Sequence, residues 1–398
     1  MTGSQPRGAR APSGQLAGLP VSGAWTADDP PAARKFVKLG QGRPFALEGG
    51  GTLDEITLAY ETWGTLNAER SNAILICHAL TGDAHARGPS GPGQPADGWW
   101  DDLIGPGRAL DTDRFFLVCS NVLGGCQGST GPASPHPVDG RPYGSRFPVI
   151  SIRDMVRAQR GLADHLGIDR WLTVIGGSMG GMQVLEWGVL YPRRVRSLVP
   201  IASATAASAQ QIAWSAVGRM AVTNDPAWRA GDYYDAAPGE GPHAGLALAR
   251  QIAQIHYRSE TVFQERFGRE LAAPLDRFEL DTKFQVESYL DYHGAKLVRR
   301  FDANTYLLLN KAMDLHDLAR GRGSLQSAMA RIDVPVCTMS ISSDTLYPPY
   351  QQHQIRDLLV AAGTSVTHVE IDSPHGHDGF LLEFDQVGAA VGKFLASL

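Results

Sequence analysis

The sequence predicts an α/β protein with a mostly parallel sheet flanked by helices and a helical insertion near its middle. Short continuous apolar runs alternate with stretches of helical periodicity, and such runs are typical of strands buried on both faces. Strand texture stops after about residue 203 and resumes near residue 334. We therefore expect a core formed by 33–204 and 332–398, interrupted by a helical lid at 205–331.

The individual elements follow from their periodicity, taken in chain order. Residues 56–62 alternate as a half-buried strand does. Continuous apolar runs predict further strands at 73–77, 115–119, 172–175, 334–340 and 366–371. Apolar residues at helical spacing predict helices over 152–166, 182–190, 245–257 and 284–297. The last two helices fall inside the predicted lid.

Composition excludes several classes of protein. The 398 residues are 43% hydrophobic, which is enough for a sizeable core and excludes a wholly disordered chain. A net charge of −5 lacks the positive field of a nucleic-acid-binding protein. We find neither a membrane span nor a signal peptide. Residues 1–32 are rich in Gly, Ala, Pro and Ser and predict a disordered leader.

The cysteines predict a reducing compartment and no metal site. Four cysteines over this length do not make a disulfide framework, and none of them forms a C-x-x-C pair. Structural zinc is therefore not expected. Reduced thiols fit a cytoplasmic enzyme best.

Residues 176–180 read Gly-Gly-Ser-Met-Gly and match the G-x-S-x-G nucleophile elbow. A predicted strand precedes this segment and a predicted helix follows it, which is the context that the motif requires. The glycines allow strand and helix to approach closely around the turn. Ser178 is thus a candidate nucleophile, and the backbone N–H of Met179 would face a developing oxyanion. A glycine-rich turn without chemistry is the alternative reading of the motif alone.

A serine nucleophile needs a base, and the elbow motif predicts an acid and then a histidine later in the chain. Asp344 follows the strand predicted at 334–340, and His377 follows the strand predicted at 366–371. His375 competes for the role of base. We prefer His377, because Gly376 frees the backbone before it and Asp378 supplies a second polar group after it.

The second oxyanion donor of such sites usually comes from a loop after an early strand. Here that loop is 78–83, directly after the run that ends at Cys77. The backbone N–H of Leu80 is our candidate. An ordinary loop at the end of a strand is the alternative.

Taken together, these motifs resemble the homoserine O-acetyltransferases, a family of the α/β-hydrolase superfamily. The resemblance rests on the segments 60–64, 78–82, 124–132, 176–182, 284–290 and 376–381. It implies the α/β-hydrolase fold and a triad of Ser178, Asp344 and His377. It also implies ping-pong acetyl transfer from acetyl-CoA, a co-substrate, to the side-chain hydroxyl of L-homoserine, a step in methionine biosynthesis. It implies no bound cofactor. It does imply a homodimer that forms through the lid helices.

The resemblance further implies how the acceptor is bound. Homoserine is a zwitterion, so its site needs a cation for the carboxylate and an anion for the ammonium group. The family's residues match Arg250, Tyr257 and Asp378 in this sequence. Arg250 and Tyr257 are seven residues apart, which places both on one face of a helix. Without the resemblance, a surface arginine and a packed tyrosine would be the better reading.

Two rival activities remain open on the sequence. Relatives that succinylate homoserine tend to carry an arginine just after the catalytic aspartate, whereas residues 344–349 hold no positive charge, which favours acetyl. Ser129 stands where acetyl-transferring relatives more often have threonine. A serine esterase would use the same triad, but it would not need Arg250 and Asp378.

Overall fold

The computed structural model describes residues 16, 18–40, 42–273, 280 and 282–398. An eight-stranded sheet forms its centre, in the order β1-β4-β6-β5-β7-β8-β9-β10. β4 is antiparallel to both its neighbours, β1 and β6, and all other neighbours are parallel. The strands are β1 Lys35–Leu39, β4 Ile56–Trp63, β5 Ala73–Cys77, β6 Phe116–Ser120, β7 Thr173–Gly177, β8 Leu198–Ile201, β9 Val336–Ile341 and β10 Val366–Ile371. A short pair, β2 Phe45–Ala46 and β3 Thr52–Leu53, lies outside this sheet.

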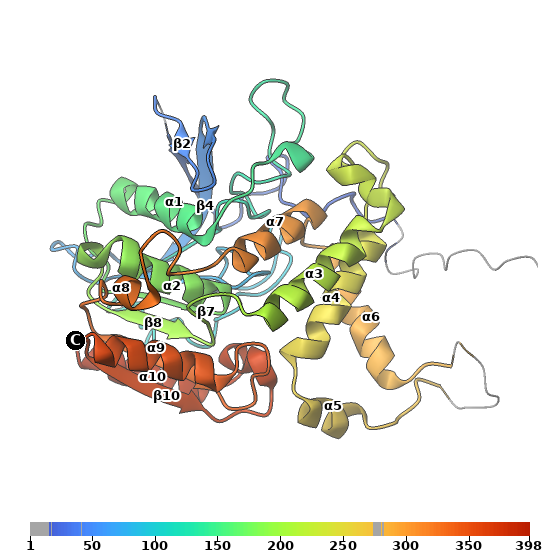
Figure 1. Ribbon diagram of the computed structural model, residues 1–398. Coiled ribbons are helices and arrows are strands. Elements are labelled where there is room, and N and C mark those ends of the chain that lie inside the picture. Colours follow the sequence, from blue (N-terminus) through green and yellow to red (C-terminus); the bar gives the residue numbers. More distant parts are fainter. Residues whose placement is uncertain (1–15, 17, 41, 274–279, 281) are drawn as a thin grey trace, which may run out of the picture.

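Helices cover both faces of the sheet and form a separate group beside it (Figure 1). The core helices are α1 Ile152–His165, α2 Met179–Leu190, α8 Leu325–Met329, α9 Pro349–Ala361 and α10 Phe384–Ala396. Between β8 and β9 lie α3 Ala209–Thr223, α4 His243–Tyr257, α5 Glu260–Phe267, α6 Gln285–Val298 and α7 Ala303–Asp314. The 3-10 helices are η1 Gly144–Arg146, η2 Pro192–Arg194, η3 Pro226–Gly231 and η4 Gly376–Leu381. No described helix is both long enough and apolar enough to cross a membrane.

The alternation of β5 shows how two cores arise from one sheet. Leu75 and Cys77 belong to the core beneath α1, α2 and α9, whereas Ile74 and Ile76 belong to the core beneath α10. All four side chains are fully buried, because successive strand residues point to opposite faces. This three-layer arrangement confirms the predicted α/β class.

Some elements escaped the sequence patterns for identifiable reasons. β8 contains Pro200, which cannot donate a ladder hydrogen bond and is therefore unusual in a central strand. α9 buries Gln351 and Gln352 toward the core, so it lacks a clear apolar stripe. By contrast, α1 falls where predicted, and Ser151 and Asp154 cap its first turn reciprocally.

The segment predicted as a disordered leader differs from that expectation where it is described. Residues 1–15 and 17 lie outside the described residues. Further on, the Ser22 hydroxyl donates to Asp302 at 2.8 Å. The N–H groups of Gly23 and Trp25 donate to backbone carbonyls of Phe301 and Cys126 at 3.2 and 2.9 Å. Composition gave no sign of these bonds, because all their partners lie far away in the sequence.

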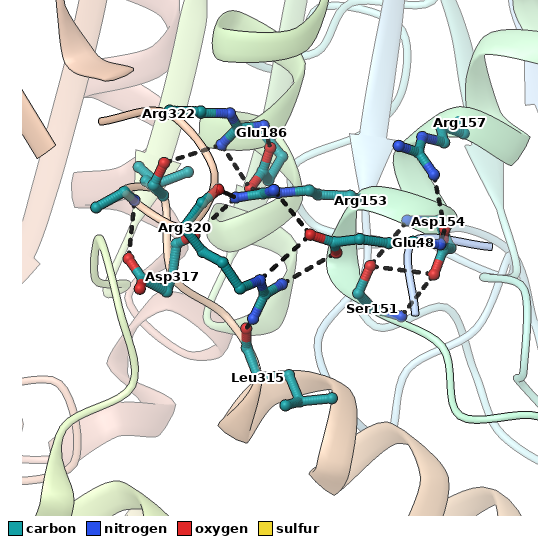
Figure 2. Close-up of polar contacts among 12 residues, drawn as sticks. Glu48, Ser151, Arg153, Asp154, Arg157, Glu186, Leu315, Asp317, Arg320 and Arg322 are labelled. Carbon is teal, nitrogen blue, oxygen red and sulfur yellow. Dashed lines mark hydrogen bonds and ion pairs between the residues drawn. The ribbon is translucent and has the colours of Figure 1, made fainter. Parts of the chain in front are cut away.

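A buried ion network joins the segment after α7 to α1 and α2 (Figure 2). Arg153 of α1 donates to Glu186 of α2 at 3.0 Å and to Glu48 at 2.7 Å. Arg320 and Arg322, which follow α7, pair with Glu48 at 3.0 Å and with Glu186 at 2.5 Å respectively. The helix that follows the predicted elbow, α2, is therefore fixed by charge to the segment after α7.

Candidate active site

Ser178 lies at the sharp turn between β7 and α2, as the elbow motif requires. Its backbone has φ 58° and ψ −124°, a conformation that a non-glycine residue rarely adopts. The Ser178 N–H donates to the Ile201 carbonyl at 2.9 Å and helps hold the turn. A Cβ atom on Gly180 would collide with the Cys77 carbonyl, so only glycine lets α2 approach the end of β5 this closely.

Asp344 and His377 meet at the carboxyl ends of β9 and β10. The Nδ1 atom of His377 lies 2.7 Å from Oδ2 of Asp344. The other carboxylate oxygen accepts the N–H groups of Leu346 and Tyr347, both at 2.8 Å, which fixes the carboxylate. Nδ1 therefore carries the proton and donates it to Asp344, which leaves Nε2 as the basic atom. His375, the competing histidine, lies 3.9 Å from Glu383 and not beside Asp344.

The surroundings of His377 shift its pKa upward. Burial is the largest influence and by itself lowers the pKa of His377. The charge of Asp344, its hydrogen bond and the nearby charge of Asp378 act in the opposite direction and outweigh burial. The net pKa lies above the ordinary value of 6.5.

Aromatic rings enclose the imidazole and bring it to the elbow. The rings of Tyr257, Tyr347 and Phe380 lie 5.9, 5.0 and 5.5 Å from that of His377, centroid to centroid. Phe380 also packs directly on Gly177, the residue before Ser178. Among the described residues, the buried Nε2 atom of His377 has no hydrogen-bond partner. Hydrogen bonds between a catalytic base and its nucleophile are often long before substrate binds. The absence of a partner is therefore compatible with Nε2 of His377 acting as the base for Ser178.

The two candidate oxyanion donors belong to neighbouring segments. Met179 is the first residue of α2, so its N–H has no carbonyl in a preceding helical turn. Leu80 lies in the loop after β5, and the Gln183 side chain joins this loop to α2. Its Nε2 donates to the carbonyls of His78 and Met179 at 3.2 and 3.1 Å. Gln159 of α1 in turn donates to Gln183 at 2.7 Å.

Two further residues hold the same loop. Nε2 of His78 accepts the N–H of Val122 at 3.0 Å, so Nδ1 carries the proton and donates to the Ala79 carbonyl at 2.8 Å. The Arg300 guanidinium donates to the Thr81 carbonyl at 2.7 Å. Sequence reasoning missed His78, Gln183 and Arg300 in these roles. The signal was present in part, since His78 opens the same motif that named Leu80.

The three residues matched to acceptor binding lie together. The Arg250 guanidinium is 5.3 Å from the centre of the Tyr257 ring, one helical face along α4. Arg250 and Asp378 both line one cavity of about 220 Å³. Asp378 already has a cationic partner, because Nε of Arg258 lies 3.3 Å from its Oδ2 atom. Arg258 was not identified from the sequence, where it reads as an ordinary basic residue at a helix end.

Ser129 lies inside the fold. Its hydroxyl accepts the N–H of Ala59 at 3.0 Å and donates to the Asn121 carbonyl at 2.7 Å. The residue is 3% exposed. Its hydroxyl thus joins the glycine-rich loop to β4 and to the residue that follows β6. Among the described residues, no three His, Cys, Asp or Glu side chains are grouped so as to hold a metal ion.

Sequence comparison places the chain among named relatives. A family model described as the alpha/beta hydrolase fold matches residues 72–384. The chain is 53% identical over 378 residues to the homoserine O-acetyltransferase of Thermobifida fusca, which covers 95% of this chain and 98% of that protein. It is also 53% identical over 352 residues to the homoserine O-acetyltransferase of Moorella thermoacetica, covering 88% and 93% of the two chains.

Solved structures agree in fold. The crystal structure of homoserine O-acetyltransferase from Bacillus anthracis superposes with a TM-score of 0.83 at 30% identity, covering 91% of this chain and 97% of that one. The crystal structure of esterase E22 superposes with a TM-score of 0.82 at 28% identity, covering 91% and 99%. The same architecture therefore occurs in proteins named for acyl transfer and for ester hydrolysis.

Proposed function

Because the chain belongs to the homoserine O-acetyltransferase family of α/β-hydrolase-fold enzymes, we propose that it transfers the acetyl group of acetyl-CoA to the side-chain hydroxyl of L-homoserine. The products are O-acetyl-L-homoserine and CoA, in a step of methionine biosynthesis. The observation that carries this proposal is the His377–Asp344 pair beside a cavity that holds both Arg250 and Asp378.

In the first half-reaction Ser178 becomes acetylated. Nε2 of His377 takes the hydroxyl proton while Oγ of Ser178 attacks the thioester carbonyl. The N–H groups of Leu80 and Met179 stabilise the negative charge on the carbonyl oxygen. The C–S bond then breaks, and the proton held by His377 passes to the departing sulfur. Asp344 stabilises the imidazolium that exists between these two proton transfers.

In the second half-reaction homoserine takes the acetyl group. Arg250 binds the carboxylate of homoserine, and Asp378 binds its ammonium group. His377 accepts the proton of the side-chain hydroxyl as its oxygen attacks the acetyl carbonyl. The bond to Ser178 breaks, and His377 returns the proton to Oγ. No cofactor takes part in either step; acetyl-CoA acts as a co-substrate.

Orientation favours this acceptor over water. Well-placed groups react with effective molarities of about 10⁵–10⁸ M, which exceeds the concentration of water. A cavity with a cation and a carboxylate beside the catalytic histidine suits a zwitterion, and an esterase has no need of it. This is the feature that favours transfer over the hydrolysis for which esterase E22 is named.

The exposed apolar side chains support a homodimer, and the cysteines support a cytoplasmic location. Apolar side chains are exposed on two lid helices: Ile212, Val217 and Met220 on α3, and Leu248 and Ile255 on α4. Exposed apolar side chains that gather on adjacent elements mark protein interfaces. All four cysteines are buried and free, as expected in a reducing compartment.

A matrix of donors and acceptors tests the activity. We expect O-acetyl-L-homoserine from acetyl-CoA and L-homoserine, little product with succinyl-CoA or with L-serine, and slow hydrolysis when no acceptor is present. The Ser178→Ala protein should release no CoA, because it lacks the acyl acceptor; triad losses in such enzymes cost about 10⁶-fold in rate. Faster product formation from succinyl-CoA than from acetyl-CoA would change the proposed activity to succinyl transfer. Release of acetate at a rate that homoserine does not affect would identify the protein as an esterase.

A further inference from the structure

Helix α4 presents basic side chains to a single cavity. Arg250 and Gln254 lie four residues apart on one face of α4, and Arg258 is the extended residue that directly follows the helix. All three line the cavity of about 220 Å³. When the Gln254 amide is oriented with its oxygen toward Arg250, it accepts from Nε and Nη2 at 3.2 and 2.7 Å. The neutral Gln254 amide thus orients the Arg250 guanidinium without neutralising its charge, which remains available to a ligand.

Residues of helix α6 and of the segment just after it line the same cavity. His293, Lys296 and Arg300 recur at spacings of three and four, and all three line it. Arg300, just beyond the end of α6, donates to a carbonyl and not to a carboxylate. Lys296 is exposed, and no hydrogen bond or ion pair within the described part of the chain engages its ammonium group.

The cavity carries more positive charge than is needed to bind the acceptor, homoserine. Four of its lining residues are cations, namely Arg250, Arg258, Lys296 and Arg300, and one is a carboxylate, Asp378. Homoserine carries one charge of each sign, so its binding leaves the excess of three positive charges unchanged. An excess of this size in a concave site attracts a ligand with several negative charges.

His293 responds to this excess. Burial first, and then the charges of Arg250, Lys296, Arg258 and Arg266, lower the pKa of His293 to about 4. The imidazole is therefore neutral at physiological pH. The positive charges of Arg250, Lys296, Arg258 and Arg266 add to the effect of burial in the same direction.

We propose that the outer end of this cavity, with Lys296 as its main contact, binds the phosphate groups of the acyl donor. This inference rests on the proposed function, which supplies a donor that carries a diphosphate and a 3′-phosphate. The pantetheine arm separates those phosphates from the thioester, so their partner must lie toward solvent. Arg250 contacts Tyr257, whose ring faces His377, and Arg258 pairs with Asp378, the residue after His377. Lys296, by contrast, is exposed.

One cavity can serve both substrates because they bind in turn. In a ping-pong reaction CoA leaves before homoserine enters, so the cavity holds the donor phosphates first and the acceptor carboxylate afterwards. Arg250 then acts on the acceptor, and Lys296 acts on the donor.

The test compares donors with and without phosphates. Lys296→Ala should raise the KM for acetyl-CoA about ten-fold, the loss of one charge-assisted contact, with little change in kcat. The KM for S-acetylpantetheine, which has no phosphate, should not change. Lys296→Arg should retain most of the affinity for acetyl-CoA, because it restores the positive charge. Lys393→Ala, which removes an exposed lysine of α10, is the control and should leave both KM values unchanged.

Binding of CoA, measured by titration calorimetry, makes the test independent of turnover. CoA should bind about ten-fold more weakly to Lys296→Ala than to the wild type, and the difference should shrink as salt is raised. Equal CoA affinity, or equal KM increases for both donors, would overturn the phosphate site even if acetyl transfer is found. Conversely, Lys296-dependent CoA binding without O-acetylhomoserine formation would overturn the proposed function and leave this site standing.

Discussion

At the scale of single residues, the site depends on how His377 is held. Asp344 uses one oxygen for two backbone N–H groups and the other for Nδ1 of His377. The imidazole therefore has one available nitrogen, Nε2, and one tautomer that can act as a base. The same ion pair raises the pKa of His377 despite its burial.

This pKa predicts the acid side of the pH profile. The base must be neutral to accept a proton, so kcat/KM should rise with pH through the raised pKa of His377, at a value above 6.5. Asp344→Asn should lower that apparent pKa, because it removes the neighbouring charge, and should lower kcat by about 10⁴-fold. Initial rates across pH 5 to 9 would measure both effects.

His375→Ala provides the comparison for that profile. His375 lies near Glu383 and does not contact Asp344, so its loss should leave both the rate and the acid limb nearly unchanged. If the His375 variant lost its acid limb while the His377 variant kept activity, the assignment of the base would be wrong.

At the scale of elements, the helix that follows the nucleophile is fixed by buried charge. Glu186 of α2 is 1% exposed and pairs with Arg153 of α1 and with Arg322 of the segment after α7 (Figure 2). Buried ion pairs add little net stability, but removing one partner leaves an uncompensated charge. The network thus makes the position of α2 depend on both α1 and the segment after α7.

Glu186→Ala should therefore destabilise the protein strongly. We expect a loss of about 3–5 kcal/mol in the free energy of unfolding, because the buried Arg322 would lose its carboxylate partner and Arg153 would keep only Glu48. Urea unfolding followed by circular dichroism would measure it. Glu55→Ala, which breaks an exposed pair with Lys38, should cost only about 0–1 kcal/mol. Similar losses in the two variants would show that burial of the Glu186 network does not matter.

At the scale of the whole molecule, α3 and α4 expose apolar side chains. Met220 of α3 is 57% exposed and Leu248 of α4 is 47% exposed. The two helices meet closely, where a Cβ on Gly245 would touch the Ala221 carbonyl. This surface is where we place the contact between two copies of the chain.

Charges on that surface should separate the copies. The double variant Met220→Glu, Leu248→Glu would bring two carboxylates into a desolvated interface, which is costly for charged groups. We expect a folded monomer in analytical ultracentrifugation where the wild type is a dimer. Val360→Glu, at an exposed position of α9 outside the lid, should leave the dimer intact. A wild type that sediments as a monomer would dismiss this interface.

Local sequence determined those parts of the protein whose chemistry depends on neighbours in the chain. The strand at 73–77, the elbow at Ser178 and the first turn of α1 follow from apolar runs, glycine spacing and capping residues. The acid and the histidine could be named because they follow strands in a fixed order. Only the tertiary structure decided contacts between distant segments. The Arg258–Asp378 pair and the bridge from Gln183 to His78 join residues about 100 positions apart, and no local pattern encodes which partner such a side chain meets.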